Sequence, residues 1–298
     1  MSQIEIRNIS KTFNKQLVLK ELTFDVPDGS VFFLLGLNGA GKTTLMKILL
    51  GLLRPDQGEV IFKEDKANIG CSIETPPFYE NLNGYQNLKH YSILTDCSKE
   101  HIVHVMRIVG LDVQNPKPVK KYSLGMRQRL AIARSLMGKN NLIMLDEPLN
   151  GLDPAGIQDI KGMIKKLNQE QNRSFFISSH LIRETEDLAT HYAILHQGSI
   201  VCLFPISEMK HICQKIHVAC AETSQEALLS SLSMLLENNY ICKADGIHIY
   251  GNVTSDNTAL FSQICSSGYE QQTKIVNGSI EELFLAVTKG GQESVTYC

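Results

Sequence analysis

A glycine-rich stretch that ends in lysine and threonine is the clearest chemical feature of this sequence. It reads Gly36-Leu-Asn-Gly-Ala-Gly-Lys-Thr-Thr44 and fits the pattern G-x-x-x-x-G-K-[ST]. Such glycines let backbone N–H groups point at phosphate oxygens, and the helix that follows adds the positive end of its dipole. A glycine turn without function is the alternative, but the loop has a buried strand before it and a helix after it. The predicted nucleotide contacts are Asn38, Gly39, Ala40, Gly41, Lys42, Thr43 and Thr44.

Within this loop, two side chains have predicted roles. Lys42 is expected to reach the β- and γ-phosphates, and the Thr43 hydroxyl is expected to ligate Mg²⁺. Two acids then end the apolar run 142–145, where a buried carboxylate needs cations or hydrogen-bond donors. Asp146 is placed to bind Mg²⁺ directly or through water, and Glu147 to polarise the attacking water as general base. The alternative, a plain helix N-cap, is disfavoured by the phosphate loop upstream.

Three further turns carry polar residues that could act on a nucleotide. Asn150-Gly-Leu-Asp153 is a tight acidic turn that follows the two acids. Ser178-Ser-His180 ends the next apolar strand, on the side where ligands bind in parallel sheets, so His180 is expected to bond the γ-phosphate and orient Glu147. A lone histidine there would more often be structural. The third turn, Tyr122-Ser-Leu-Gly-Met126, opens a basic helix.

The elements that must position these residues follow from the hydrophobic pattern. Val31-Phe-Phe-Leu-Leu35 is a continuous apolar run that predicts a buried parallel strand, and a helix is expected over 42–53. Apolar strands are expected at 142–145, 174–178 and 192–196, and largely helical structure over 80–138. The segments 3–8 and 17–26 alternate apolar and polar residues, which predicts antiparallel strands at a sheet edge. The fold class is therefore α/β, with a parallel-sheet core, an antiparallel edge and a helical subdomain.

After Gly198 the pattern changes, and Pro205 supports a domain boundary there. The order of elements predicted for 206–298 is strand, helix, hairpin, helix, strand, helix. This order contains the βαββαβ pattern of a small ferredoxin-like α+β domain, followed by one further helix. The predicted hairpin is 240–250, the second helix is 257–267, and the last helix opens with a capping box at Ser279. The predicted domains are thus 1–205 and 206–298, and the role of the second one stays open.

Composition limits the classes of partner. The chain has 298 residues, 43% of them hydrophobic, and a formal charge of −2, so no basic excess would recruit nucleic acid. No run approaches the ~20 apolar residues of a membrane span, and the N-terminus lacks a signal-peptide pattern, so a cytoplasmic location is expected. Eight cysteines are scattered without a C-x-x-C pair, which disfavours a zinc site.

Taken together, these motifs resemble the nucleotide-binding subunits of ABC transporters across roughly residues 3–200. The resemblance implies an ATPase with ATP and Mg²⁺, attached to the cytoplasmic face of the membrane by polytopic permease subunits. It identifies Phe13 with the aromatic that stacks on adenine, and Asp153 with the acid of the D-loop. It also identifies 122–126 as the signature motif, which covers the γ-phosphate held by a second subunit. Ser123, Gly125 and Met126 would then complete a site in a head-to-tail homodimer.

The chain departs from the family pattern at two places. Leu124 and Met126 stand where the family norm is glycine and glutamine, while Ser123 and Gly125 are kept. Glu74 stands where the family has a glutamine that contacts Mg²⁺ or the attacking water. Glutamate keeps an oxygen ligand but adds charge, which Mg²⁺ attracts and the γ-phosphate repels, and the sequence leaves the net sign open. The alternative is neutral drift on an exposed loop.

A narrower resemblance concerns ATPases of lantibiotic-immunity and bacitracin-resistance exporters. It rests on the Ile73-Glu-x-Pro-x-Phe-Tyr79 loop, the Ser-Leu-Gly-Met signature and the Ser279-Ile-Glu-Glu-Leu-Phe284 element. It implies that the subunit powers the export of amphipathic peptide antibiotics. Two alternatives stay open: an ABC ATPase for another class of transported substrate, or a soluble ABC protein that acts on ribosomes or DNA.

Overall fold

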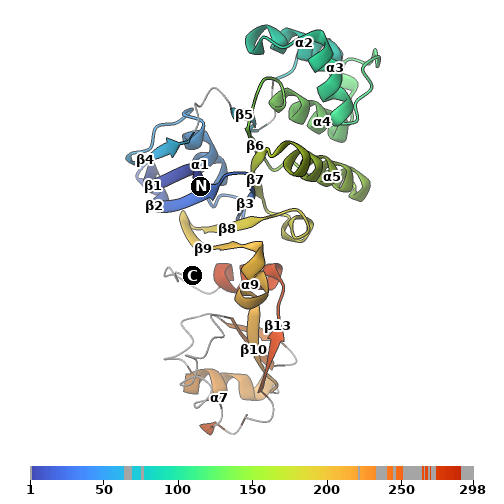
Figure 1. Cartoon of the computed structure of the whole chain (residues 1–298). Coiled ribbons are helices and arrows are strands. Elements are labelled where there is room, and N and C mark those ends of the chain that lie inside the picture. The colour runs from blue at the N-terminus through green and yellow to red at the C-terminus, as the bar shows by residue number, and fades with distance from the viewer. Residues whose placement is uncertain are drawn as a thin grey trace. The chain divides into compact units, whose positions relative to one another are not determined.

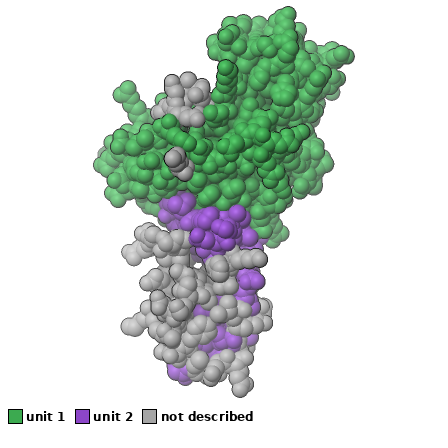
Figure 2. All heavy atoms as spheres, in the orientation of Figure 1, with its two compact units in different colours: residues 1–199 green, residues 200–298 purple. Residues whose placement is uncertain are grey.

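The computed structural model divides into two compact units, residues 1–199 and residues 200–298 (Figure 2). The sequence places the division near residue 205, whereas it falls here at the start of strand β9 (Ser199–Pro205). The structure describes residues 2–63, 69–74, 77–220, 222–232, 240–243, 246–250, 264, 266–267, 269 and 273–289. In these described ranges, every helix is too short or too polar to span a membrane.

A parallel sheet forms the centre of the first unit, with strand order β5-β6-β7-β3-β8 (Figure 1). Every residue of β3 and β7 is buried, as expected for strands covered on both faces. Phe32 of β3 stacks on Phe176 of β7, with ring centroids 5.4 Å apart. The predicted buried parallel strand at 31–35 is confirmed. The strands are β3 (Val31–Leu35), β5 (Ile69–Ser72), β6 (Leu142–Asp146), β7 (Ser174–Ser179) and β8 (His191–His196).

The carboxyl ends of these strands carry the predicted functional residues. Strand β3 leads into the glycine-rich loop and helix α1 (Lys42–Leu49), β6 ends at Asp146, and β7 ends one residue before His180. Because parallel strands end at one edge of the sheet, these segments meet there. Helix α5 (Pro154–Gln171) follows β6, and the short 3-10 helix Ile182–Thr185 follows β7.

Three antiparallel strands form a separate sheet in order β2-β1-β4, drawn in blue in Figure 1. They are β1 (Ser2–Phe13), β2 (Gln16–Pro27) and β4 (Gln57–Phe62). The antiparallel strands predicted at 3–8 and 17–26 are confirmed, and together with β4 they form a sheet that is separate from the parallel one. Alternate residues such as Ile4 and Ile6 are fully buried while others face solvent, which is typical of an antiparallel sheet covered on one face.

Three helices pack together beside the parallel sheet: α2 (Gly84–Thr95), α3 (Lys99–Ile108) and α4 (Leu124–Ser135) (Figure 1). Side chains at their N-caps satisfy backbone N–H groups that would otherwise lack partners. Asn83 and Gln86 form a capping box at α2, and the side chains of Ser98 and Ser123 cap α3 and α4. Helix α4 also packs against β5 and β6, so the group is tied to the central sheet.

The second unit contains a four-stranded antiparallel sheet in order β11-β12-β10-β13. Ser279 and Glu282 form the predicted capping box, since each side chain accepts from the other residue's backbone N–H. Most of the helix predicted at 257–267 lies outside the described residues. The remaining elements are α6 (Met209–Ile212), β10 (Gln214–Val218), α7 (Glu222–Leu232), β11 (Tyr240–Lys243), β12 (Gly246–Tyr250), β13 (Thr273–Asn277) and α9 (Ile280–Lys289).

Candidate functional site

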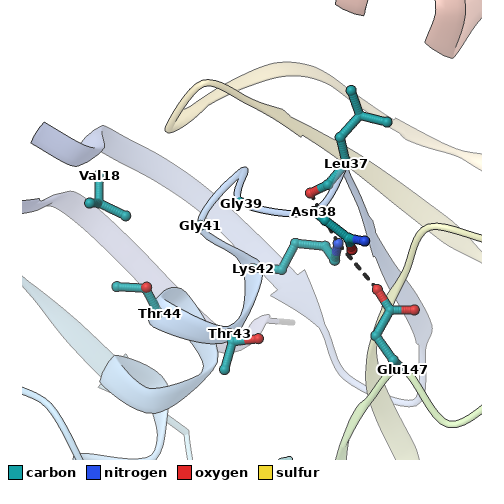
Figure 3. Close-up of a pocket in the computed structure, with 9 residues that line it drawn as sticks. All are labelled: Val18, Leu37, Asn38, Gly39, Gly41, Lys42, Thr43, Thr44 and Glu147. Atoms are coloured by element: carbon teal, nitrogen blue, oxygen red, sulfur yellow. Dashed lines mark hydrogen bonds and ion pairs between the residues drawn. The ribbon is translucent and has the colours of Figure 1, made fainter.

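The loop between β3 and α1 surrounds a cavity of about 210 Å³ (Figure 3). Gly41 has φ 109°, and a Cβ there would come within 2.7 Å of Leu19 Cδ2, so this position requires glycine. Gly39 also has positive φ, and no atom lies within 4 Å of the place where its Cβ would be. The loop therefore offers open backbone beside the cavity. The cavity is lined by Val18, Leu37, Asn38, Gly39, Gly41, Lys42, Thr43, Thr44 and Glu147.

Lys42 is the cation of this cavity and is almost completely buried. Its Nζ donates to Gly36 O at 2.7 Å and to Leu37 O at 3.3 Å, and it lies 3.1 Å from Glu147 Oε1 (Figure 3). A buried ammonium needs such partners, because its desolvation would otherwise be costly. The lysine thus places positive charge at the mouth of the glycine-rich loop, beside the carboxylate of Glu147.

Asp146 accepts a hydrogen bond with each of its two carboxylate oxygens. Thr43 Oγ1 donates to Asp146 Oδ2 at 2.9 Å, and Ser178 Oγ donates to Asp146 Oδ1 at 2.5 Å. The same Ser178 Oγ accepts the backbone N–H of Glu147 at 3.0 Å. Sequence reasoning assigned no role to Ser178, although the two serines that end β7, Ser178 and Ser179, were an available signal. It fixes the two acids relative to each other.

Glu147 stands between a lysine and a histidine. Its Oε2 lies 2.8 Å from His180 Nδ1 and also accepts the backbone N–H of His180 at 3.3 Å. The backbone of Glu147 is left-handed, with φ 49°, a conformation that costs about 1–3 kcal/mol for a residue other than glycine. The hydrogen bonds from Ser178 and His180 offset this strain. A carboxylate is thereby held in the lining of the cavity, beside Lys42.

The donor set of this site fits a nucleotide with Mg²⁺. The Thr43 hydroxyl and the Asp146 carboxylate offer hard oxygen ligands 2.9 Å apart. In the described part of the chain, no group of three His, Cys, Asp or Glu side chains could hold a metal ion by itself. The Thr43 and Asp146 oxygens suit Mg²⁺, which binds through one or two protein oxygens together with the phosphates of a nucleotide.

Two predicted site residues lie elsewhere. Phe13 is 43% exposed at the end of β1 and does not line the cavity, whereas Val18 of β2 does. Lys11 Nζ stands 5.5 Å from the centre of the Phe13 ring. Glu74 is not among the residues that line the cavity, and its Oε1 pairs with Lys47 Nζ at 2.6 Å. Lys47, which sequence reasoning did not consider, lies on α1 and presents the opposite charge to this carboxylate.

The signature turn and the acidic turn after β6 contact each other, and neither lines the cavity at Lys42. Ser123 Oγ accepts the Met126 N–H at 3.2 Å and caps α4, and Asp153 Oδ1 accepts the Gly156 N–H at 3.1 Å and caps α5. Gly125 lies against the turn after β6: a Cβ there would be 3.5 Å from Leu152 Cδ2.

Leu124 of the signature turn lies against Gly151 of the acidic turn. A Cβ at Gly151 would lie only 2.5 Å from Leu124 Cδ2, and Gly151 has φ +72°, so both space and backbone require glycine there. Leu124 itself is 56% exposed. The two turns thus form one surface of the subunit.

Comparison with known proteins agrees with this geometry. A family model described as ABC transporter matches residues 19–150. SrtF of Streptococcus pyogenes, a lantibiotic transport ATP-binding protein, is 40% identical over 204 residues, 66% of this chain and 89% of SrtF. BcrA of Enterococcus faecalis, a bacitracin transport ATP-binding protein, is 41% identical over 216 residues, 69% of this chain and 70% of BcrA.

A solved structure shows the same fold. The dimeric structure of MJ0796, a bacterial ABC transporter cassette, matches with a TM-score of 0.63 at 21% identity, over 68% of this chain and 98% of that one. The nucleotide loop, the acidic strand end and the sequence relatives lead to one assignment. The chain belongs to the family of ABC transporter ATP-binding proteins.

Proposed function

We propose that this chain is the ATP-hydrolysing subunit of an exporter that moves peptide antibiotics away from the cell membrane. The observation that carries the ATPase assignment is the Glu147 carboxylate, held between Lys42 and His180 beside the glycine-rich loop. The substrate class is supported by two relatives, which are named as lantibiotic and bacitracin transport proteins. The subunit works at the cytoplasmic face of the membrane, attached to permease subunits.

Each residue at the cavity has its own role in binding or hydrolysing ATP. Lys42 and the backbone of the loop hold the phosphates, while Thr43 and Asp146 would hold Mg²⁺, which supplies charge neutralisation on the phosphate oxygens. Glu147 accepts a proton from the water that attacks the γ-phosphate. His180 orients Glu147 through its Nδ1 and contacts the γ-phosphate. Phe13 packs on adenine beside Val18, and Glu74 acts on the metal from the edge of the site.

A second copy of the chain completes each ATP site. In one subunit the turn at Ser123, Gly125 and Met126 lies away from the cavity at Lys42, which supports a site shared between subunits. In a head-to-tail homodimer, Ser123 and the N-terminus of α4 cover the γ-phosphate held by the partner, and Asp153 lies beside them. The segment proposed to face the permease is 74–90, of which the structure describes 74 and 77–90, and its Tyr79 is 65% exposed.

A resistance assay tests this function. A sensitive host that carries this chain and its permease genes is expected to tolerate more bacitracin or lantibiotic than a host with the permease alone. Lys42→Ala, which removes the phosphate-binding ammonium, is the control and should abolish the gain. An ATPase-active chain that gives no resistance would contradict the substrate class. Co-purification with ribosomes or DNA, rather than with a membrane protein, would contradict the exporter.

A further inference from the structure

Tyr122 lies directly before Ser123, and its hydroxyl bonds another part of the helical group. The hydroxyl accepts a 3.0 Å hydrogen bond from the backbone N–H of Gly84, the first residue of α2. The contact is tight, since a Cβ at Gly84 would lie 2.8 Å from the hydroxyl oxygen. Tyr122 is only 8% exposed. The tyrosine and the glycine therefore form a matched contact across 38 residues of sequence.

Two hydrogen bonds and an ion pair also join residues 80–82 to the chain before and after the signature turn. Before the turn, Val119 N–H donates to Leu82 O at 2.9 Å, and Lys120 N–H donates to Glu80 O at 3.0 Å. After the turn, Arg127 Nη1 lies 3.5 Å from Glu80 Oε1. The chain that enters the signature and the helix that leaves it are thus both bound to residues 80–84.

The segment 79–83 is itself held as one body by a single side chain. Asn87 is buried, and its Nδ2 donates to the carbonyls of Tyr79, Leu82 and Asn83 at 3.1, 3.3 and 3.0 Å. Its Oδ1 accepts the N–H of Tyr79 at 2.8 Å. A buried amide with its donors and acceptor engaged resists local distortion, because each broken bond would leave a desolvated polar group. A displacement of Tyr79 therefore moves the whole segment.

We propose that Tyr122 is a positioning residue that ties Ser123 to the segment 79–84. The inference rests on the proposed function, in which Tyr79 faces the permease and Ser123 completes the ATP site of the partner subunit. When the permease displaces Tyr79, the segment moves as a body and carries the start of α4 with it through Tyr122. The state of the permease thus sets how well the signature turn fits the partner's γ-phosphate.

The test uses the full chain in the Glu147→Gln background, in which ATP is expected to hold dimers. Tyr122→Phe keeps the ring and removes only the hydroxyl. It is expected to raise the ATP concentration for half-maximal dimerisation roughly tenfold, since one hydrogen bond is lost at each of two sites. Light scattering measures the dimer. Binding of a fluorescent ATP analogue to dilute monomer should stay unchanged, because the cavity at Lys42 is not altered.

A matched control separates positioning from general loss of stability. Tyr192→Phe removes another buried hydroxyl of the same unit, one that bonds Thr185 Oγ1 at 3.1 Å, away from the signature turn. It should leave the dimerisation curve in place even where it lowers the melting temperature. Equal shifts from Tyr122→Phe and Tyr192→Phe, or no shift from the first, would overturn the inference. A parent variant that never dimerises with ATP would overturn the proposed function as well.

The ion pair between Arg127 and Glu80 offers a second test if Tyr122→Phe folds poorly. Arg127→Gln removes the ion pair between Arg127 and Glu80. Both side chains are partly exposed, so folding should be retained. The variant is expected to raise the ATP concentration for half-maximal dimerisation roughly twofold, because an exposed ion pair contributes little. Glu80→Gln should give the same shift, and the double variant no more than either single one. Additive shifts, or none, would contradict the proposed link.

Discussion

Thr43 and Asp146 are joined by a 2.9 Å hydrogen bond, which connects the first turn of α1 to the end of β6. The hydroxyl and the carboxylate that are proposed to ligate Mg²⁺ therefore already lie together. Ser178 holds the other carboxylate oxygen from the neighbouring strand, so that the position of Asp146 does not depend on Thr43 alone. The sheet thus preorganises the two proposed metal ligands.

Asp146→Asn tests this arrangement. The amide keeps an oxygen for hydrogen bonds but loses the charge that attracts the metal. ATP binding in the presence of a chelator should stay within about twofold, while the gain in affinity on adding Mg²⁺ should be lost. Titration of a fluorescent ATP analogue with and without Mg²⁺ measures both. An undiminished Mg²⁺ effect would show that other groups hold the metal.

Ser178→Ala is the companion variant for Asp146. It removes the hydroxyl that bonds the Asp146 carboxylate and the Glu147 amide, and it should lower stability by about 1–3 kcal/mol. The gain in ATP affinity on adding Mg²⁺ is expected to persist in this variant, because the charge of Asp146 remains. Denaturant unfolding measures the loss of stability.

Glu147→Gln is expected to keep ATP binding, to trap an ATP-bound dimer and to abolish turnover. The amide still fits between Lys42 and His180, but it cannot accept a proton from water. Loss of a general base costs roughly 10²- to 10⁴-fold in rate. Phosphate release and gel filtration with ATP give the two readouts. A variant that retains a tenth of the turnover would exclude Glu147 as the base.

The core of this site could be predicted because its residues lie at or after the ends of three buried strands. Asp146 ends β6, Glu147 and His180 directly follow β6 and β7, and Lys42 opens the helix after the loop that follows β3. Parallel strands bring such segments to one edge of the sheet. The pair of Lys47 and Glu74 could not be predicted in this way. It joins an exposed helix face to a loop 27 residues later, and no periodicity in the sequence encodes such a contact.

Phe13→Ala tests the proposed contact with adenine. Stacking of a base on an aromatic ring contributes about 1–3 kcal/mol, so ATP affinity should fall roughly five- to 150-fold. Folding should be little affected, because the ring is 43% exposed. Leu17→Ala is a suitable control, since Leu17 is similarly exposed at the start of β2. Equal nucleotide affinities for the two variants, measured by fluorescence titration, would assign adenine contact to Val18 instead.

The Lys47–Glu74 ion pair predicts the direction in which the charge of Glu74 changes the affinity for Mg²⁺. Lys47 stands one helical turn after Thr43, so an unpaired ammonium there repels Mg²⁺, whereas an unpaired carboxylate attracts it. Glu74→Gln should raise the Mg²⁺ concentration for half-maximal ATP binding, and Lys47→Met should lower it, each by roughly two- to fivefold for a solvent-exposed pair. Fluorescent ATP binding during Mg²⁺ titration measures the shifts.

The double variant decides whether the two charges act as a pair. Glu74→Gln combined with Lys47→Met removes both charges, so its Mg²⁺ requirement should return close to that of the unmodified chain. Lys47→Arg keeps the charge and should change little. If Glu74→Gln instead lowered the Mg²⁺ requirement, the glutamate would act chiefly by repelling the γ-phosphate. Single variants that shift the requirement in the same direction would mean that Lys47 does not neutralise Glu74 when nucleotide binds.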